Sequence, residues 1–398
     1  MSQFDRHIPR YNTASVKWDL TEARFGRPEL LPLWVADMDF SAPQKVIDAI
    51  KARADHGVFG YTFPDDAYKN AVISWFLNRH QWEIKPQWIV WSPGVVPALH
   101  LLVDALSSPG DGVIIQRPVY YPFFAAIEQT GRILVNNPLQ YDGTRYTMDF
   151  ADLRKKAADP KATLLILSNP HNPVGRVWPG NDLIELGEVC IEHNITIIAD
   201  EIHCDLILQG HHVPFGTLGS KFLKQAAICT APSKTFNLAG LHTSNIIISE
   251  ADKRTAFEKA LRRVGLFGPN TLGGVACQAA YEHGGPWLNK LLAYIKGNVR
   301  FLTEYLATHL PQVQVLPAEG TYLVWLDFRE LEPDSDKLER LMLDEAKVAL
   351  DEGYFFGPEG AGFERINVAC PRSILQQALE QIVNAFQSAG LQHKNSEM

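Results

Sequence analysis

The sequence predicts an α/β protein with a large, doubly wound, mostly parallel sheet and a smaller α+β domain. Between about residues 42 and 284, segments with helical spacing alternate with short apolar runs. Both alternating positions of these runs are apolar, as parallel strands require when helices cover both faces of the sheet. Repeated strand–helix–strand units form doubly wound layers. From residue 285 onward the alternation is lost, which indicates a second domain.

The elements of the first part follow in order along the chain. Pro and Trp mark the first forty residues, which are too few for a domain and are expected to pack across one. The helical period is clearest at 94–106, where Val95, Leu99, Leu102 and Leu106 recur every three or four positions. We expect helices over 42–55, 65–80, 94–106 and 181–193. We expect strands over 88–91, 113–116, 163–167, 195–199, 227–230 and 245–248.

The last hundred residues are expected to form helices over 285–309, 336–351 and 373–387, and strands over 313–316, 321–328 and 365–369. A chain of 398 residues is two to three times the usual size of one domain. We predict a large domain over residues 49–284 and a small domain built from both chain ends, residues 1–48 and 285–398. No long Gly/Ser linker marks the joint, so the two domains should share a substantial interface.

Composition excludes several classes of protein. Hydrophobic residues make up 46% and charged residues 21%, which is ordinary for a globular protein and unlike a disordered, collagen-like or disulfide-stapled chain. The formal charge of −8 disfavours binding to nucleic acid or a membrane surface, although a local pocket for one small anion is compatible with it. We find no signal peptide and no apolar run long enough for a membrane span, and expect a cytoplasmic protein.

Ligands of open parallel sheets bind beyond the carboxyl ends of the strands, so the residues after each strand are informative. Ser92-Pro93-Gly94-Val95-Val96 leads a strand into a helix, whose free N–H groups can bind an anion; an ordinary helix cap is the alternative. The loop 168–175 (SNPHNPVG) is rigid and polar, and structural and functional roles are equally compatible with it.

Two ionisable residues follow later strands. Asp200 comes at the end of an apolar run, where burying a carboxylate is costly unless a cation meets it. His203, His211 and His212 follow it, but their spacing does not suit a metal site, and we expect none. Lys234 lies just past a strand among apolar residues, as a lysine that forms imines would; a surface lysine is the alternative. Together, a lysine, a carboxylate, an anion cup and an Asn are what a pyridoxal phosphate site requires.

The motifs around these residues resemble those of a known family. SNPHNPVGR, ADEIHCDL and APSKTFNLAGL, in this order, resemble the fold-type I pyridoxal-phosphate (PLP) enzymes of the class I/II aminotransferase superfamily. LWVADMDF (33–40), HGVFGYT (56–62) and RPVYYPF (117–123) resemble the cystathionine β-lyase, or carbon–sulfur lyase, branch of MalY/PatB type. The resemblance runs from about residue 18 to 388 and implies pyridoxal 5′-phosphate as cofactor.

The resemblance also implies roles for single residues. It makes Lys234 the lysine that binds the cofactor and removes the substrate α-proton, and it pairs Asp200 with the pyridine nitrogen. It assigns Asn172 to the cofactor 3-oxygen and to substrate, and Tyr120 to stacking on the ring and to catalysis. Tyr121 would line the site, and Arg365 would bind the substrate α-carboxylate. The phosphate would be bound by Val95, Val96 and Ser233, and by Tyr61 from a neighbouring subunit.

Two positions depart from the usual aminotransferase pattern. His203 stands where aminotransferases carry Tyr, which agrees with the lyase branch and implies a different hydrogen bond near the cofactor. His242 stands where they carry a basic Arg, which weakens the expectation of phosphate binding there. We therefore include His203, but not His242, among the cofactor-binding residues.

The function expected from the resemblance is α,β-elimination from L-cystathionine or a related cysteine S-conjugate, giving pyruvate, ammonia and a thiol. Transamination on the same fold is the alternative within enzymes. A regulator that keeps the fold and binds a transcription factor is the alternative from another class. Both methionine biosynthesis and detoxifying cleavage of S-conjugates suit the lyase, and the carried-over role of Tyr61 implies a homodimer. Trp34, Phe40 and Tyr322 are pocket candidates that the sequence does not place.

Overall fold

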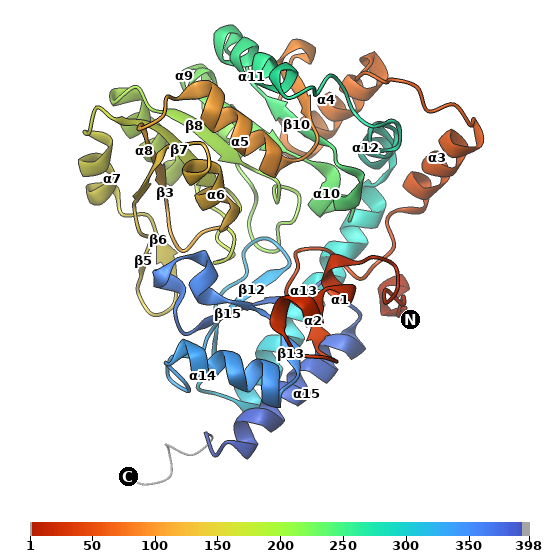
Figure 1. Cartoon of the computed structure of the whole chain (residues 1–398), viewed down its shortest axis with the longest axis vertical. Coiled ribbons are helices and arrows are strands. Elements are labelled where there is room, and N and C mark those ends of the chain that lie inside the picture. The colour runs from red at the N-terminus through yellow and green to blue at the C-terminus, as the bar shows by residue number, and fades with distance from the viewer. Residues whose placement is uncertain (1, 392–398) are drawn as a thin grey trace.

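A seven-stranded sheet lies at the centre of the larger part of the molecule (Figure 1). The structure is a computed structural model and describes residues 2–391. In spatial order the strands are β2 (Ile89–Ser92), β10 (Ser244–Ile247), β9 (Ala226–Thr230), β8 (Thr196–Asp200), β7 (Ala162–Ser168), β3 (Gly112–Ile115) and β4 (Ile133–Asn136). Neighbouring strands are parallel except at β10, which is antiparallel to both β2 and β9. The predicted mostly parallel sheet is thus confirmed.

Helices cover both faces of this sheet, as the apolar runs of the sequence predict. Within β7, Leu164 and Ile166 belong to one hydrophobic cluster, whereas Leu165 and Leu167 belong to another on the opposite face. The first cluster includes residues of α5 (Val95–Leu106), α6 (Pro122–Glu128) and α11 (Ala251–Arg263). The second includes residues of α4 (Asp66–His80), α8 (Gly180–Glu192), α9 (Ser220–Gln225) and α12 (Thr271–His283).

Smaller elements complete this part of the chain. They are α3 (Gln44–Asp55), the hairpin of β5 (Gln140–Tyr141) and β6 (Tyr146–Thr147), α7 (Phe150–Ala157) and the one-turn helix α10 (Pro232–Thr235). The five cysteines of the chain are buried free thiols, which pack as small apolar side chains. None of the helices within residues 2–391 is both long and apolar enough to cross a membrane.

A second, antiparallel sheet lies below the first in Figure 1. Its strands, in spatial order, are β11 (Gln314–Val315), β12 (Leu323–Asp327), β15 (Phe363–Asn367) and β14 (Asp351–Glu352). Trp325 of β12 stacks on Phe363 of β15, with their ring centroids 5.2 Å apart. The helices of this part are α13 (Gly285–His309), α14 (Ser335–Arg340) and α15 (Arg372–Ser388).

The N-terminal segment joins this second part. Helices α1 (Val16–Asp19) and α2 (Thr21–Phe25) lie beside α13 and α15 in Figure 1. Strand β1 (Leu31–Pro32) pairs in parallel with β13 (Val348–Ala349), more than 300 residues later in the chain. These contacts agree with a small domain built from both chain ends, while the boundaries at residues 48 and 284 stay a prediction.

The predicted helix 336–351 is wrong in its second half. Helix α14 ends at Arg340, a single π-helical turn covers Leu341–Glu345, and the chain then forms β13 and β14. Lys347 adopts a left-handed backbone conformation with φ of 57°, which ends helical geometry there. Val348 and Ala349 are then fully buried against β1. Tertiary pairing of this apolar run outweighs its local helical pattern.

Candidate active site

The polar residues that follow the strands converge at one edge of the large sheet. Ser168 at the end of β7 is in register with Asp200 at the end of β8, and Asp200 is in register with Cys229 of β9. A cavity of about 260 Å³ opens at this edge. Eight of the residues named from the sequence line it: Val95, Val96, Tyr120, Asn172, Asp200, His203, Ser233 and Lys234.

Lys234 lies on the one-turn helix α10, directly after β9. Its Nζ donates a hydrogen bond to the carbonyl oxygen of Ala36, at 2.7 Å. Burial lowers the pKa of Lys234 to about 8, and the positive charge of Arg365 acts in the same direction, whereas Asp37 and Asp200 oppose the shift. The amine is therefore neutral far more often near pH 7 than an exposed lysine, and a neutral amine is a nucleophile and a base.

Asp200 places a carboxyl group in the same cavity. Its Oδ1 accepts a hydrogen bond from the backbone N–H of Ile202 at 3.2 Å, and within residues 2–391 it takes part in no ion pair closer than 4 Å. Burial raises the pKa of Asp200 to about 7, and the positive charge of Lys234 offsets only part of this shift. A buried carboxyl without a close cation suits a ligand that brings its own positive charge, such as a protonated ring nitrogen.

The opposite wall offers an anion site. Helix α5 begins at Val95, and its first turn has no side-chain cap, so the N–H groups of Val95 and Val96 lack the usual capping acceptor. Ser233 lines the same cavity. Free N–H groups and the positive end of the helix dipole together favour a phosphate. An amine, a carboxyl group and a phosphate cup in one cavity are the donor set that PLP requires, so the residues fit this cofactor.

Asn172 and Arg365 form the next layer of the site. Nη1 of Arg365 donates to Oδ1 of Asn172 at 2.9 Å, and Nη2 donates to the carbonyl oxygen of Trp34 at 2.9 Å. Arg365 also forms a buried ion pair with Asp351 and is only 2% exposed. The guanidinium group thus lies behind Asn172, where it is held in place for a carboxylate.

Three of the predicted site residues, Arg365, Tyr121 and Tyr61, do not line the main cavity. Tyr121 lines a neighbouring cavity rather than the main one, although its ring lies beside that of Tyr120. Tyr61 is fully exposed and does not line the cavity of its own chain. His203 is buried, its Nδ1 has no hydrogen-bond partner in the described part of the chain, and burial together with Lys234 lowers its pKa well below the usual value. His242, which was left out of the prediction, does line the cavity.

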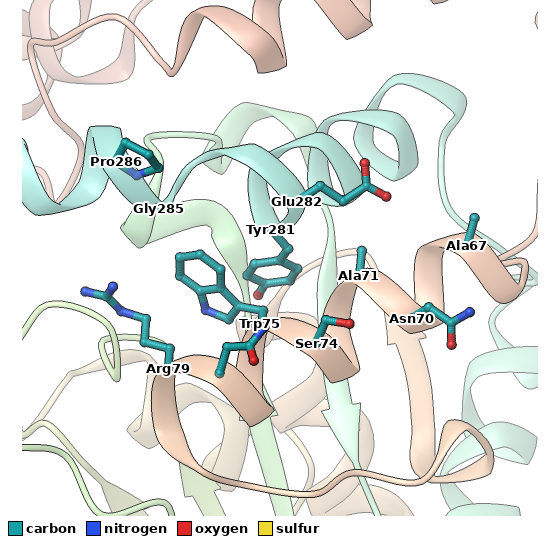
Figure 2. A pocket seen from close by; sticks show the side chains of 11 residues that line it. Ala67, Asn70, Ala71, Ser74, Trp75, Arg79, Tyr281, Glu282, Gly285 and Pro286 are labelled. Atoms are coloured by element: carbon teal, nitrogen blue, oxygen red, sulfur yellow. The ribbon is translucent and has the colours of Figure 1, made fainter.

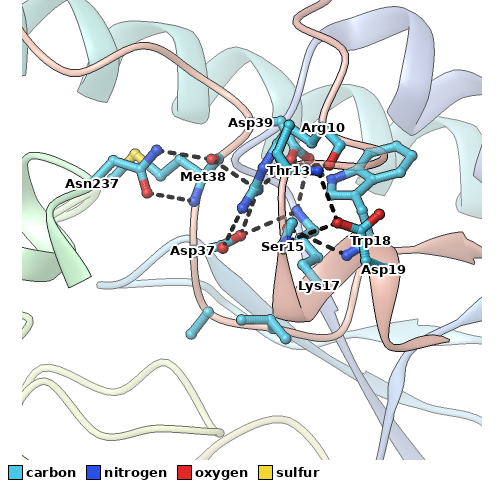
Figure 3. A network of polar contacts seen from close by, with 12 residues as sticks. Arg10, Thr13, Ser15, Lys17, Trp18, Asp19, Asp37, Met38, Asp39 and Asn237 are labelled. Carbon is cyan, nitrogen blue, oxygen red and sulfur yellow. Dashed lines mark hydrogen bonds and ion pairs between the residues drawn. The ribbon is translucent and has the colours of Figure 1, made fainter. Parts of the chain in front are cut away.

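Sequence reasoning missed how the segment 33–40 closes the site. Asn237, three residues after Lys234, binds the backbone of Met38 through both ends of its amide group, at 3.0 and 2.8 Å. Figure 3 shows this pair and the adjacent network, in which Lys17 forms a 2.7 Å ion pair with Asp39. The segment thereby presents the carbonyl of Ala36 to Lys234. The motif LWVADMDF indicates that this segment matters, but the residues that it contacts, Lys234 and Asn237, lie about 200 residues later in the chain.

A second missed residue is Asp205, which is buried and follows Asp200 by five residues. Its Oδ2 accepts a hydrogen bond from Oγ1 of Thr235 at 2.8 Å, and its Oδ1 lies 2.8 Å from Nε2 of His80. Cys204 brings a third group within reach of a metal ion, but both carboxylate oxygens of Asp205 already accept hydrogen bonds, from Thr235, His80 and Trp75. Asp205 therefore fixes the turn that carries Lys234.

Removing the hydrogen bond between Thr235 and Asp205 should lower activity without removing any group that touches substrate. We expect Thr235→Val to lower kcat about tenfold, because a displaced Lys234 spends less time at the reacting atoms. It should also destabilise the protein by about 1–2 kcal/mol, because Asp205 loses a buried donor. Thr235→Ser keeps the hydroxyl and is the matched control. Steady-state kinetics and thermal unfolding of both variants check the prediction; equal effects of Val and Ser would contradict it.

A larger cavity, of about 600 Å³, lies between α4 and the α12–α13 junction. Figure 2 shows the rings of Trp75 and Tyr281 at its centre and Arg79 at one side. None of the residues named from the sequence lines it. Trp75 and Arg79, which line this cavity, contact Asp205. The cavity therefore lies next to the residue that fixes the turn of Lys234, and not at the polar edge of the sheet.

Comparison with known proteins agrees with this geometry. The profile of the family "Aminotransferase class I and II" matches residues 28–382. The chain belongs to this family. The resemblance and the fold predicted from the sequence are thus confirmed.

Among the members of the family, cystathionine beta-lyase PatB of Bacillus subtilis (strain 168) is 47% identical, covering 96% of this chain and 99% of that protein. Protein MalY of Escherichia coli (strain K12) is 34% identical, covering 98% of this chain and 100% of that one. The crystal structure of cystalysin from Treponema denticola, which contains pyridoxal 5′-phosphate, superposes with a TM-score of 0.94 at 40% identity, covering 97% and 99% of the two chains.

Proposed function

We propose that this protein is a PLP-dependent carbon–sulfur β-lyase that cleaves L-cystathionine or a related cysteine S-conjugate into pyruvate, ammonia and a thiol. The observation that carries the proposal is the meeting of half-buried Lys234, buried Asp200 and the uncapped first turn of α5 in the lining of one cavity. Similarity to PatB, MalY and cystalysin over nearly the whole chain favours a lyase over other activities of the family.

In this proposal each wall of the cavity binds one part of PLP. Val95, Val96 and Ser233 bind the phosphate, Asp200 pairs with the ring nitrogen, Asn172 binds the 3-oxygen, and Tyr120 stacks on the ring. His203 lines the same cavity and stays neutral, because burial lowers its pKa. Bound PLP would exchange its bond to the Lys234 amine for one to the substrate amine and would accept the electron pair left when the Cα proton departs.

The side chains of the protein then direct the elimination. Arg365, held by Asn172, binds the α-carboxylate of the substrate, which fixes the Cα–H bond toward Lys234. The neutral amine of Lys234 takes the Cα proton. The bond between Cβ and sulfur breaks, and the thiolate leaves with the electron pair. Lys234 then passes its proton to the thiolate and displaces the remaining three-carbon enamine, which takes up water and yields pyruvate and ammonia.

A homodimer is part of the proposal. Val58, Phe59, Tyr61 and Phe63 are exposed in the segment between α3 and α4, and Phe267 is exposed beside them. Oγ1 of Thr62 donates to the carbonyl oxygen of Pro269 at 2.6 Å, which holds the two segments together. An exposed apolar surface of this kind suits burial against a second copy. In that dimer Tyr61 contributes its hydroxyl to the phosphate of the neighbouring subunit.

The lowered pKa of Lys234 predicts how cofactor attachment depends on pH. Only the neutral amine reacts with the aldehyde of PLP, so the attachment rate should rise up to about pH 8 and level off above it. At pH 7 roughly one amine in ten is then neutral, against fewer than one in a thousand for an unperturbed lysine. Mixing cofactor-free protein with PLP between pH 6 and 10, followed by visible absorbance, measures the profile. A rate that still rises at pH 10 would contradict the lowered pKa.

The experiment that tests the function supplies PLP-loaded protein with L-cystathionine and measures pyruvate. We expect pyruvate and thiol to appear in equal amounts. Conversion of the cofactor into its pyridoxamine form, with an added keto acid required for turnover, would identify an aminotransferase instead. The proposal fails if no cysteine S-conjugate yields pyruvate while the protein binds PLP.

A further inference from the structure

A cavity of about 370 Å³ lies close to the proposed binding site of the substrate carboxylate, because Arg24 in its wall and Arg365 both pair with Asp351. Its wall consists of Arg24, Phe25, Tyr121, Glu339, Glu352 and Phe355. Tyr121 connects it to the active site, since its ring centroid lies 5.6 Å from that of Tyr120. A substrate held by Arg365 therefore has this cavity as a neighbour.

Arg24 supplies a positive charge to the cavity. Its guanidinium group lies 4.4 Å from the ring centroid of Trp34, and its side chain is 32% exposed. Nη2 of Arg24 is 3.7 Å from Oδ1 of Asp351, a buried oxygen with no hydrogen-bond donor within residues 2–391. The other oxygen of Asp351 pairs with Arg365. Asp351 thus lies between two arginines, and a ligand with a carboxylate at each end is complementary to both.

Glu352 supplies an unsatisfied acceptor. The residue is 3% exposed, and its Oε2 has no hydrogen-bond donor in the described part of the chain. Its register partner Glu364 on β15 is also buried. Burial raises the pKa of Glu352 above its ordinary value, and the negative charge of Asp351 adds to the shift. Buried polar atoms normally have a partner, so this oxygen suits a cationic group of a ligand.

We propose that this cavity binds the leaving group and selects S-conjugates whose sulfur substituent ends in a second amino-acid group. Arg24 binds the distal carboxylate, Glu352 binds the distal ammonium, and the rings of Phe25, Tyr121 and Phe355 pack on the methylene chain. An S-alkyl substituent would offer neither a carboxylate to Arg24 nor a cation to the unpartnered oxygen of Glu352, which is a basis for discrimination. The inference rests on the proposed function and adds the class of substrate to it.

The test compares kcat/KM for L-cystathionine and S-propyl-L-cysteine, whose sulfur substituent has no charged group. Arg24→Met keeps the length of the side chain and removes its charge. We expect it to lower kcat/KM for L-cystathionine about 10- to 100-fold and to change that for S-propyl-L-cysteine less than twofold. Arg24→Lys should keep most of the preference. Arg27→Met is the control, since Arg27 pairs with Asp344 outside this cavity.

Glu352→Gln tests the other charge with a third substrate, S-(3-carboxypropyl)-L-cysteine, which lacks only the distal ammonium of L-cystathionine. We expect the variant to lose activity toward L-cystathionine about tenfold and to keep its activity toward the carboxypropyl compound. Equal losses on all substrates, or no loss on any, would overturn the proposed subsite while the lyase function stands. If the PLP-loaded wild-type protein releases pyruvate from neither these three compounds nor any other cysteine S-conjugate, the proposed function itself fails.

Discussion

Lys234→Ala is expected to abolish pyruvate release, lowering kcat about 10³-fold or more. Lys234 has two roles in the proposed reaction, since it holds the cofactor covalently and takes the Cα proton. The alanine variant keeps the phosphate cup of α5 and the carboxyl group of Asp200, so it should still bind PLP. Its visible spectrum should be that of the free aldehyde and not of the lysine-linked cofactor. Kinetics and absorbance of the same sample separate the two roles.

Lys221→Ala is a matched control, because Lys221 is exposed and pairs with Glu188 on the surface. It should leave both the spectrum and kcat unchanged. Added methylamine should restore part of the activity of Lys234→Ala if the missing group is a base. Retention of more than about a tenth of wild-type kcat by Lys234→Ala would contradict the role, since proton transfer alone contributes at least 10²-fold.

The sheet and the polar edge could be predicted because their signals are local. Runs that are apolar at both alternating positions indicate buried parallel strands, and the register of Ser168 with Asp200 follows once β7 and β8 are parallel neighbours. The sequence predicts a helix over 285–309, and α13 spans Gly285–His309. The prediction is accurate because a long apolar stripe at helical spacing is typical of an amphipathic helix. The eight lining residues came from positions after strands and from motif resemblance.

The remaining parts depend on contacts between distant segments. Asn237 binds Met38, 199 residues away, and neither residue alone indicates the other. Strand β13 forms where the sequence favours a helix, because β1 pairs with it from the far end of the chain. The neutral state expected of His203 and the buried support given by Asp205 likewise arise from burial, which depends on the packed structure.

Asp200→Asn is the second variant with a large expected effect. The amide cannot stabilise the positive charge of a protonated ring nitrogen, so the cofactor accepts the electron pair of the Cα–H bond less well. We expect kcat to fall about 10²- to 10³-fold, the usual cost of removing one electrostatic stabiliser from an active site. The size of the side chain hardly changes, so PLP should still attach to Lys234. Asp252→Asn, on the exposed face of α11, is the control and should leave kcat unchanged.

The same substitution should have the opposite effect on the stability of the cofactor-free protein. Burial raises the pKa of Asp200 to about 7, above its ordinary value of 3.8. Between these two pH values the unfolded chain releases the proton and the folded chain keeps it. Rising pH therefore lowers the free energy of unfolding, and above pH 7 this loss of stability stays constant. Asparagine does not ionise, so Asp200→Asn should be more stable at pH 8, by on the order of a few kcal/mol, and no more stable at pH 3.5.

Thermal unfolding with and without PLP at both pH values measures this difference. In the wild-type protein PLP should raise Tm more than in Asp200→Asn, because the ring nitrogen provides the cation that the buried carboxylate lacks. If Asp200→Asn loses activity while its cofactor-free form gains stability, the carboxylate of Asp200 serves cofactor chemistry and destabilises the folded protein. Equal stability of the two cofactor-free proteins at pH 8 would instead mean that Asp200 is already satisfied without PLP.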